Sequence, residues 1–462
     1  MQLDNTIVAL ATPSGTGAIG LIRISGKEAL KIASKSFKSH RDIDINKQTS
    51  HKTFLGWFKD GERIIDKVLL TVFRGPNSYT GENIVEISCH GSSYILQEIL
   101  ALLIKNGAEP AKPGEFTLRA FLNKKMDLTQ AESVADLIAS ESKASHELAI
   151  NQMRGGYSKN ISDLRGQLIH FASMIALELD FSEEDVEFAN RDEFSKLLEE
   201  IESQLKDLSD SFAYGSVIKN GVPVAIIGKP NAGKSSLLNA LLNEDKAIVS
   251  EIEGTTRDSI EDTLIIKGIQ FRFIDTAGLR DTKDKIESIG VKRALENAKK
   301  AKILLYIYDV TDKNIKGVLE QLKSIVKLNK KIILIQNKMD IATGGEIISD
   351  LIKKEFNKLS TPLPASTNEK ISIQELKSLL VETINEIGGD SQTIVTNVRH
   401  HNSLNKALKD IQSVKKSMNK NVTGDLISVD LNSAIYSLGE ITGEIDSDEV
   451  LGNVFQNFCI GK

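Results

Sequence analysis

This chain of 462 residues has little cysteine and no long hydrophobic run. Its two cysteines, Cys89 and Cys459, stand far apart, and no signal-peptide pattern accompanies them. Secreted domains that depend on disulfides carry cysteines in denser sets, so a reducing compartment, the cytoplasm, is expected. A membrane-spanning helix needs ~20 apolar residues, and the lack of such a run argues against a membrane protein. Cysteine and histidine also form no cluster of the kind that binds metals.

The charge is close to balanced. Lys and Arg number 58 and Asp and Glu 63, a formal net charge of -5. A general nucleic-acid-binding surface would show as a marked excess of positive charge, so any contact with RNA has to be local. The length exceeds what one hydrophobic core usually serves, and two or three domains are expected.

The first 122 residues predict an α+β domain. Apolar runs separated by Gly, Pro and Ser turns predict strands over residues 6–12, 19–24, 67–73 and 83–88. A helix is expected from Tyr94 to about Asn106, ending at Gly107. Cys89 and His90 are neighbours in a predicted strand, so their side chains should point to opposite faces and cannot form a simple nucleophile and base pair.

After residue 122 the sequence pattern predicts mainly helices. Apolar residues at three-and-four spacing form core stripes, at Ile161, Leu164, Leu168, Phe171, Ile175 and Leu179, and again at Leu198, Ile201, Leu205, Leu208 and Phe212. Thr129 and Glu132 fit a capping box at the start of an earlier helix, and acidic residues 183–187 fit a solvated turn. Helical stripes return after residue 385 with little core of their own. We therefore expect residues 123–217 and 386–462 to form one helical domain, into which residues 218–385 are inserted.

Residues 224–236 read as a strand, a glycine-bounded loop and the start of a helix. Gly228 and the run Gly233-Lys234-Ser235 fit the pattern G-x-x-x-x-G-K-[ST] in the context that this motif needs. The loop's N–H groups and the helix N-terminus can hold phosphates. Lys234 can reach the terminal phosphates, and the Ser235 hydroxyl can ligate Mg²⁺. With strands and helices alternating beyond the loop, residues 218–385 predict a mostly parallel α/β domain of the phosphate-loop type.

Three further motifs follow in the order of a guanine-nucleotide switch. Thr256, in the segment 254–258, can complete Mg²⁺ coordination while a γ-phosphate is present. The segment 275–278, Asp-Thr-Ala-Gly, places a carboxylate near Mg²⁺ and a glycine N–H near the γ-phosphate. In the segment 337–340, Asn-Lys-Met-Asp, the Asp340 carboxylate can accept two hydrogen bonds from guanine, which adenine does not offer. Adenine nucleotides are therefore expected to be rejected.

Two positions depart from the usual pattern of small GTPases. Where Ser-Ala-Lys usually precedes the last helix, this chain has Pro364, Ala365 and Ser366, which leaves the serine contact to guanine open. Leu279 stands where many such proteins carry a water-positioning glutamine. Because leucine cannot orient water, catalysis must come from Arg257, Arg280, a carboxylate, a metal ion or a partner protein.

Taken together, the motifs resemble one family, the tRNA modification GTPase MnmE (TrmE) family. Besides the GTPase motifs, the resemblance rests on residues 76–82, 113–116, 119–123, 127–132 and the terminal Phe-Cys-Ile-Gly-Lys of residues 458–462. It runs nearly end to end.

The resemblance implies an N-terminal folate-binding and dimerisation domain. It also implies that a tetrahydrofolate carbon is joined to glycine or ammonium on the wobble uridine of certain tRNAs, giving a 5-carboxymethylaminomethyl or aminomethyl group. The expected partners are a second copy of the chain, an FAD-dependent protein of the MnmG type, and tRNA. By matching position, the folate contacts would be Arg23, Glu82, Lys125 and Lys462. A carboxylate suits the donor edge of a pterin, and cations suit its glutamate tail.

The resemblance also implies that K⁺ lies beside the phosphates, in the place of an arginine finger. Its ligands would be Asn231, Ser250, Ile252 and Thr255, and Mg²⁺ would be held by Ser235 and Thr256; oxygen-rich sites suit both ions. Glu287 falls at the position of the family's catalytic carboxylate, and Lys234 and Thr256 complete the catalytic set. The GTP contacts by matching position would be Asn231, Ala232, Gly233, Lys234, Ser235, Ser236, Ser250, Glu251, Ile252, Glu253, Gly254, Thr255, Thr256, Asp275, Thr276, Ala277, Gly278, Asn337, Lys338, Met339 and Asp340.

The residues alone leave other functions open. A regulatory GTP-dependent binding switch would share every nucleotide motif and lack the folate site. In a third interpretation the helices form a scaffold without an enzymatic part. Cys459 is open to both a reactive and a packing role.

Overall fold

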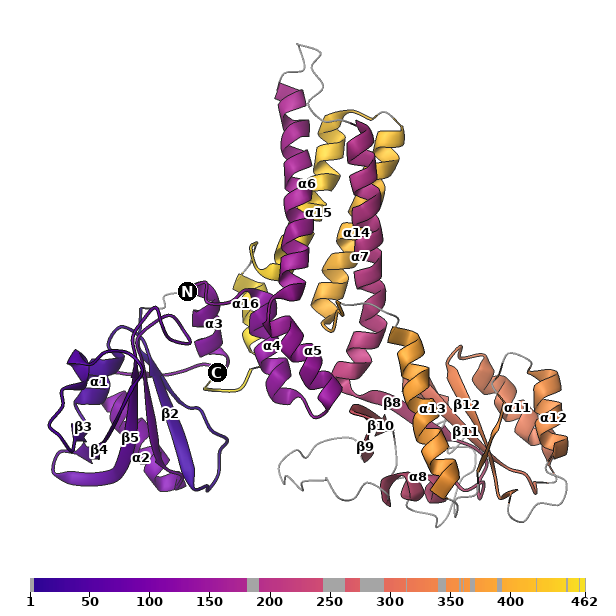
Figure 1. Ribbon diagram of the computed structural model, residues 1–462, viewed down its shortest axis with the longest axis horizontal. Coiled ribbons are helices and arrows are strands. Elements are labelled where there is room, and N and C mark those ends of the chain that lie inside the picture. Colours follow the sequence, from indigo (N-terminus) through magenta and orange to yellow (C-terminus); the bar gives the residue numbers. More distant parts are fainter. Residues whose placement is uncertain are drawn as a thin grey trace. The chain divides into compact units, whose positions relative to one another are not determined.

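The computed structural model divides the chain into two compact units, which are described separately here (Figure 1). Unit 1 contains residues 1–139, 149–203 and 402–462, and unit 2 contains residues 140–148 and 204–401. The residues whose structure is described are 4–180, 191–243, 262–274, 295–312, 314–339, 346–356, 359, 361–365, 370–388, 393–420, 422–445, 448–456 and 458–461.

A seven-stranded sheet forms the N-terminal part of unit 1. Its strand order is β3-β4-β5-β6-β2-β1-β7; the β1–β7 pair is parallel and the other pairs are antiparallel. The strands are β1 (Ile7–Leu10), β2 (Ile19–Ser25), β3 (Phe37–Ser39), β4 (Lys52–Asp60), β5 (Arg63–Phe73), β6 (Ile84–His90) and β7 (Glu109–Pro110). The helices beside them are α1 (Ala29–Ser34), the 3₁₀ helix η1 (Ile45–Lys47) and α2 (Ser93–Lys105).

Burial along β5 shows which face of this sheet carries the core. Val68, Leu70 and Val72 are buried in one cluster with residues of α1 and α2, whereas Leu69 between them is 46% exposed. Successive side chains of a strand point to opposite faces, so the helices cover one face. The four predicted strands and the predicted helix are confirmed as β1, β2, β5, β6 and α2. Strands β3, β4 and β7 were not predicted; β3 and β7 are very short, and β4 is held by pairing with β5.

Helices make up the rest of unit 1 and continue into unit 2. They are α3 (Glu115–Leu122), α4 (Leu128–Ala139), α5 (Lys143–Met153), α6 (Gly156–Asp180), α7 (Arg191–Asn220), α14 (Val398–Asn419), α15 (Gly424–Thr442) and α16 (Asp448–Phe455). Helices α6 and α15 run side by side (Figure 1), with Leu168 and Leu438 fully buried. Arg165 of α6 donates from Nε to the carbonyl of Ile435 at 3.3 Å and forms an ion pair with Glu444.

Helices from both sides of the nucleotide segment thus pack into one group. The expected helical domain built from two chain segments is confirmed. The segment boundaries stay predictions, because the two units separate within α5 and α7 rather than between elements.

The start of α4 corrects the predicted capping box. The helix begins at Leu128, and the Asp127 carboxylate accepts from the Gln130 N–H at 2.9 Å while the Gln130 side chain accepts from the Asp127 N–H at 3.0 Å. The box is therefore formed by Asp127 and Gln130, not by Thr129 and Glu132. Thr129 lies inside the helix and is 1% exposed. Aspartate accepts hydrogen bonds at an N-cap at least as well as threonine, and the earlier of two candidates begins the helix here.

A six-stranded sheet forms the core of unit 2. The strand order is β13-β12-β11-β8-β10-β9, with β9 and β10 antiparallel and the other pairs parallel. The strands are β8 (Val222–Ile227), β9 (Asp262–Ile266), β10 (Ile269–Phe273), β11 (Ile303–Asp309), β12 (Lys331–Asn337) and β13 (Leu363–Ala365). The helices are α8 (Lys234–Asn243), α11 (Ile315–Val326), α12 (Glu346–Glu355) and α13 (Lys370–Gly388).

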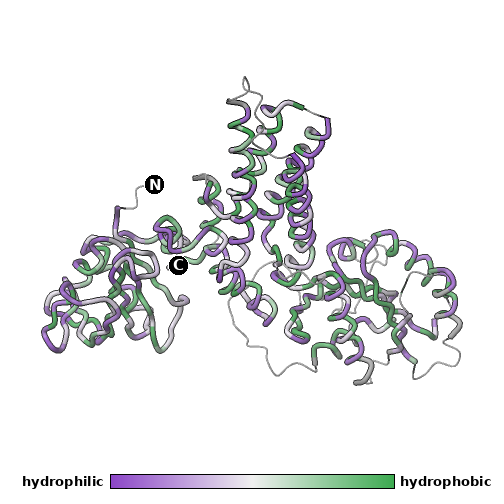
Figure 2. Tube along the Cα trace, turned by 45° about the horizontal axis from the view of Figure 1, so that its top comes forward, coloured by the Kyte–Doolittle hydropathy of each residue, from purple (hydrophilic) through white to green (hydrophobic). Residues whose placement is uncertain are grey.

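Helices cover both faces of this sheet. Leu304 and Leu305, neighbours in β11, are both fully buried and belong to different core clusters. The central strands accordingly appear as hydrophobic traces in Figure 2. Strands buried on both faces are typical of parallel α/β sheets, and the predicted α/β phosphate-loop domain is confirmed. Its ligand site is expected outside the carboxyl ends of β8, β11 and β12.

Candidate functional site

The phosphate loop connects β8 to α8 at the carboxyl edge of the sheet. Asn231 and Gly233 have φ values of 64° and 101°, in the left-handed region. A Cβ on Gly233 would lie 2.1 Å from Nδ2 of Asn337, and one on Gly228 would lie 2.1 Å from the carbonyl oxygen of Ile307. Both glycines are therefore required by close approach, and the motif adopts a single tight loop against neighbouring strands.

Lys234 is held by its own loop. Its Nζ donates to the carbonyl oxygens of Gly228 at 2.9 Å and Lys229 at 2.8 Å. Burial lowers the pKa of Lys234 below its usual value, because desolvation disfavours the charged form. An anion at the loop would offset that cost. Ser235 and Ser236 follow in the first turn of α8, and the first turn of a helix is where phosphate loops bind anions.

The segment predicted to recognise the guanine base, residues 337–340, contacts the phosphate loop through Asn337. Asn337, at the end of β12, is 2% exposed and donates from Nδ2 to the Ala232 carbonyl at 2.9 Å. Lys338 has a φ of 65°, and its Nζ lies 2.5 Å from Oδ2 of Asp309 at the end of β11. Met339 is 37% exposed. The structure thus brings together the ends of β8, β11 and β12, as the motif order predicts.

Several predicted site residues lie outside the described residues. These are Ser250, Glu251, Ile252, Glu253, Gly254, Thr255 and Thr256, then Asp275, Thr276, Ala277, Gly278 and Glu287, and finally Asp340 and Lys462. Also outside the described residues are Arg257, Leu279, Arg280, Ser366 and the acidic residues 183–187. Their proposed roles stay predictions.

A second polar cluster lies on β2 and the adjoining loop of unit 1. Oγ of Ser25 donates to Oε2 of Glu82 at 2.7 Å, and Arg119 of α3 donates from Nη1 to both Glu82 oxygens at 3.2 Å. Two residues before Ser25, on the same face of β2, Arg23 pairs with Glu86 at 2.7 Å. The Arg23 guanidinium also lies 5.5 Å from the ring centre of Tyr79 and 5.8 Å from that of Phe116, within the range of cation–π attraction.

Lys125, another predicted folate residue, approaches the same cluster. Nζ of Lys125 donates to the Pro76 carbonyl at 2.9 Å, and its side chain passes 3.4 Å from the point where a Cβ on Gly81 would lie. The C-terminal segment reaches this part of the sheet as well. A Cβ on Gly461 would lie 2.2 Å from the carbonyl oxygen of Leu10, a neighbour of Ile22 across β1 and β2. Arg23, Glu82 and Lys125 therefore share one neighbourhood with the residue that precedes Lys462.

Sequence reasoning did not identify the residues that support Glu82. Ser25 and Thr80 are both fully buried, with 2.7 Å between their hydroxyl oxygens, and Arg119 is also fully buried. Arg119 lies in a segment that carried the family resemblance, which was a signal, but its partners are distant in sequence. Nothing in residue spacing pairs α3 with residue 82.

The expectation for Cys89 and His90 is confirmed. Cys89 faces the core and His90 is exposed, with Nδ1 of His90 2.7 Å from Oδ1 of Asp66. Burial, together with the Asp66 carboxylate, raises the pKa of the Cys89 thiol to about 11. A thiol that remains protonated near neutral pH is a poor nucleophile. Cys459 is exposed.

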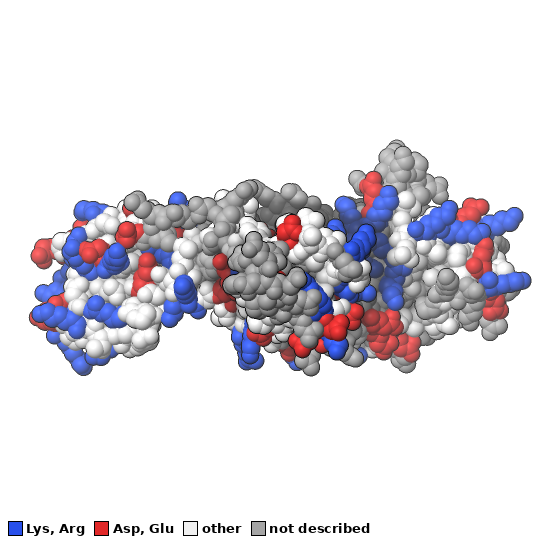
Figure 3. Space-filling view, turned by 90° about the horizontal axis from the view of Figure 1, so that it is seen from above, with Lys and Arg blue, Asp and Glu red and all other residues white. Residues whose placement is uncertain are grey.

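The surface offers both signs of charge. Figure 3 shows Lys and Arg side chains interspersed with Asp and Glu over the N-terminal α+β part, at the left of the view.

No group of three or more His, Cys, Asp or Glu residues with metal-binding geometry occurs among the described residues. Within that part of the chain, no helix combines the length and apolar character needed to cross a bilayer.

Comparison with known proteins covers both units. Residues 6–125 match the family model for the GTP-binding protein TrmE N-terminus, and residues 128–459 match the model for the MnmE helical domain. The tRNA modification GTPase MnmE of Flavobacterium psychrophilum is 54% identical over 468 residues, covering 100% of both chains. The proteins of the same name from Flavobacterium johnsoniae and Bacteroides thetaiotaomicron are 53% and 50% identical, each covering 99% of this chain and 99% and 100% of their own. This chain belongs to the MnmE (TrmE) family of tRNA modification GTPases.

Proposed function

We propose that this protein is a GTP hydrolase that acts in tRNA modification. The observation that carries the proposal is a formed phosphate loop, bonded to the base-recognition motif through Asn337 and Ala232, in a chain similar from end to end to proteins named for that activity. A phosphate loop alone serves many NTPases. The full-length similarity favours the tRNA-modifying class over other GTP-dependent switches.

The described part of the loop supports binding of a nucleoside triphosphate with Mg²⁺. Lys234 and the first turn of α8 offer a cation and N–H donors on one side of the loop. The Ser235 hydroxyl and Thr256 would hold Mg²⁺, and Asp340 would select guanine. GTP binding should raise the pKa of Lys234, since an adjacent anion favours the protonated amine.

Hydrolysis is proposed to depend on K⁺. Leu279 cannot position the attacking water, so catalysis needs another group for that task, together with positive charge near the β- and γ-phosphates. Asn231, exposed at the bend of the loop, supplies a side-chain oxygen for a cation there, and Ser250, Ile252 and Thr255 would complete the set. Glu287 is the proposed carboxylate that orients the attacking water. GTP hydrolysis would open and close paired nucleotide domains of a homodimer.

The unit 1 cluster is proposed to hold a tetrahydrofolate derivative. Arg23, Lys125 and Lys462 would bind its anionic tail, and the Glu82 carboxylate its pterin ring. The one-carbon unit would be joined to a tRNA wobble uridine in the cytoplasm, together with an FAD-dependent partner of the MnmG type. The shared neighbourhood of Arg23, Glu82 and Lys125 supports this proposal.

The test of the nucleotide site compares GTP turnover by the full-length protein in KCl and in NaCl at equal ionic strength. We expect turnover to be about 100-fold faster in KCl, a typical effect of one well-placed charge on a transition state. Asn231→Ala, which removes a proposed K⁺ ligand, should bring the ratio of the KCl rate to the NaCl rate close to one. Equal rates of the unaltered protein in both salts would contradict the K⁺ mechanism.

The test of the cellular role is nucleoside mass analysis of tRNA from cells that lack this protein. We expect the carboxymethylaminomethyl or aminomethyl group to disappear from wobble uridine and to return when the intact gene is restored. A Lys234→Ala copy should fail to restore it. An unchanged nucleoside profile would favour a GTP-dependent switch with no part in carbon transfer.

A further inference from the structure

Arg119 is the bulkiest of the fully buried side chains in the described part of the chain. A guanidinium removed from water is unfavourable unless carboxylates and carbonyl groups compensate for the lost hydration. Replacing a buried ion pair by apolar residues is often neutral for stability. The presence of a buried arginine at this place therefore requires an explanation other than stability alone.

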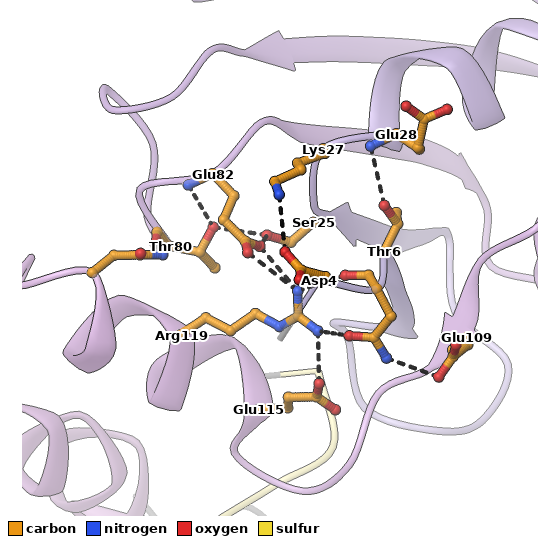
Figure 4. Close-up of polar contacts among 12 residues, drawn as sticks. Asp4, Thr6, Ser25, Lys27, Glu28, Thr80, Glu82, Glu109, Glu115 and Arg119 are labelled. Atoms are coloured by element: carbon orange, nitrogen blue, oxygen red, sulfur yellow. Dashed lines mark hydrogen bonds and ion pairs between the residues drawn. The ribbon is translucent and has the colours of Figure 1, made fainter. Parts of the chain in front are cut away.

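The arginine joins its own helix α3 to two segments that are distant in sequence, the chain at Asn5 and the loop at Glu82; Figure 4 shows Arg119 with Glu115 and Glu82. Nη2 donates to Oε1 of Glu115 at 2.8 Å and to Oδ1 of Asn5 at 2.6 Å. Nη1 donates to the Asn5 carbonyl at 2.8 Å and to both oxygens of Glu82 at 3.2 Å. The guanidinium is thus fixed by Glu115 and Asn5 on one side and contacts Glu82 on the other.

The two carboxylates of this cluster differ in what they offer to a ligand. Glu115 is 8% exposed, and its second oxygen accepts from the Lys112 N–H at 2.8 Å, so it is satisfied within the protein. The Glu82 side chain retains 20% exposure. Its Oε2 accepts a hydrogen bond from the Ser25 hydroxyl. The Ser25 hydroxyl oxygen also lies 2.7 Å from the Thr80 hydroxyl oxygen. The buried Ser25 and Arg119 thus hold the Glu82 carboxylate, while the Glu82 side chain stays partly exposed.

We propose that Arg119 is a positioning residue, anchored by Glu115 and Asn5, that fixes the Glu82 carboxylate to accept the paired N–H donors of a reduced pterin ring. The inference rests on the proposed folate function and assigns Arg119 a part in it. Arg119 itself is fully buried and does not reach the ligand. A carboxylate is a good acceptor for two adjacent donors only when it is correctly oriented, and the planar guanidinium, which donates to both Glu82 oxygens, fixes that orientation.

The test is a double-substitution cycle in the full-length protein, with 5-formyl-tetrahydrofolate as the probe and calorimetric titration as the measurement. Glu82→Gln should weaken binding by about 10- to 100-fold, the effect of losing hydrogen bonds to a charged group. Arg119→Lys should weaken binding about as much, because an ammonium cannot contact Glu82, Glu115 and Asn5 in one plane. Arg119→Lys combined with Glu82→Gln should bind no more weakly than Glu82→Gln alone. If the two losses multiply, Arg119 acts independently of Glu82 and the proposal is overturned.

Two further variants separate positioning from a general loss of stability. Arg119→Gln with Glu115→Gln removes the buried charges of that pair, so thermal stability should recover relative to Arg119→Gln alone while pterin affinity stays low. Recovery of both would overturn the proposal. Arg165→Lys is the matched control, since Arg165 is 18% exposed and pairs with Glu444 in the helical part of unit 1. Its affinity for the probe should equal that of the unaltered protein.

Failure of this inference can be told apart from failure of the proposed function. If the unaltered protein does not bind 5-formyl-tetrahydrofolate, the folate function is wrong and the role of Arg119 falls with it. If Glu82→Gln weakens binding but the Arg119 variants bind normally, the folate function stands and the positioning role is wrong.

Discussion

The proposed nucleotide site of unit 2 is made largely of consecutive backbone, whereas the proposed folate site of unit 1 is made of side chains from separate segments. The loop occupies eight consecutive positions, from Gly228 to Ser235, and Asn337 closes it through one hydrogen bond. The unit 1 cluster combines Ser25, Glu82 and Arg119, which β2, a loop and α3 contribute. A site made of consecutive backbone depends on a few conformations, and a site made of side chains depends on the whole fold around it.

The largest effect is expected from a glycine of the phosphate loop. Gly233→Ala places a Cβ 2.1 Å from Nδ2 of Asn337 and a side chain at a φ of 101°. Strain of this kind costs about 1–3 kcal/mol before the clash is counted, so GTP affinity should fall about 100-fold or more. Fluorescent-nucleotide titration measures it. Affinity for 5-formyl-tetrahydrofolate should not change, because the loop and the cluster belong to different units.

A glycine in open space provides the control for that substitution. Gly166, within α6, has no atom within 4 Å of an added Cβ. Gly166→Ala should leave GTP affinity unchanged and stabilise the helix by about 0.5–1 kcal/mol. GTP binding by Gly233→Ala at the normal affinity would show that the loop tolerates a side chain there, and the contrast between the two sites would fail.

A smaller effect is expected from the C-terminal segment. Gly461→Ala sets a Cβ 2.2 Å from the Leu10 carbonyl at a φ of 96°, which should displace the neighbouring Lys462. We expect affinity for 5-formyl-tetrahydrofolate to fall about tenfold, the loss of roughly one charge-assisted hydrogen bond, with GTP turnover unaffected. Gly452→Ala in α16, where an added Cβ meets no atom within 4 Å, is the control. If Gly461→Ala binds 5-formyl-tetrahydrofolate with normal affinity, the C-terminal segment is not part of the folate site.

The smallest effect concerns an ion pair beside the phosphate loop. Nζ of Lys229 lies 2.9 Å from Oδ2 of Asp312, and the pKa of Asp312 is lowered by the Asn314 N–H and then by Lys229. A lowered carboxyl pKa stabilises the fold above the unfolded value of 3.8, and this contribution is lost as pH falls through the folded pKa. Lys229→Met should therefore cost about 0.2–1 kcal/mol at pH 7 and less below pH 3.8.

Calorimetric unfolding of the full chain measures this difference. The unfolding transition whose midpoint temperature rises when GDP is added belongs to unit 2, because a ligand stabilises the unit that binds it. Lys331→Met, which breaks the more exposed pair with Glu386, is the control and should change stability less. If Lys229→Met lowers the free energy of unfolding by the same amount at low pH as at pH 7, the lysine acts through packing.

Local patterns predicted most of the elements and the nucleotide motifs. The stripes at Leu164 and Leu168 and at Leu198 and Ile201 are buried, as helical spacing indicates. The capping box was placed two residues too late, because Asp127 and Thr129 are both acceptable caps and only the structure decides between them. Strand β4 was missed although it pairs with the next strand of the chain, β5, across the turn at residues 61–62.

The sequence by itself determined the phosphate loop, since its glycines, lysine and serine act through the conformation of consecutive residues. Only the tertiary structure decided that Arg119 meets Glu82 and Asn5, and that Gly461 lies against Leu10. The physical reason is the range of the interactions. Backbone conformation is encoded within a few residues, whereas the partners of this buried charge come from segments that are 37 residues away for Glu82 and 114 residues away for Asn5.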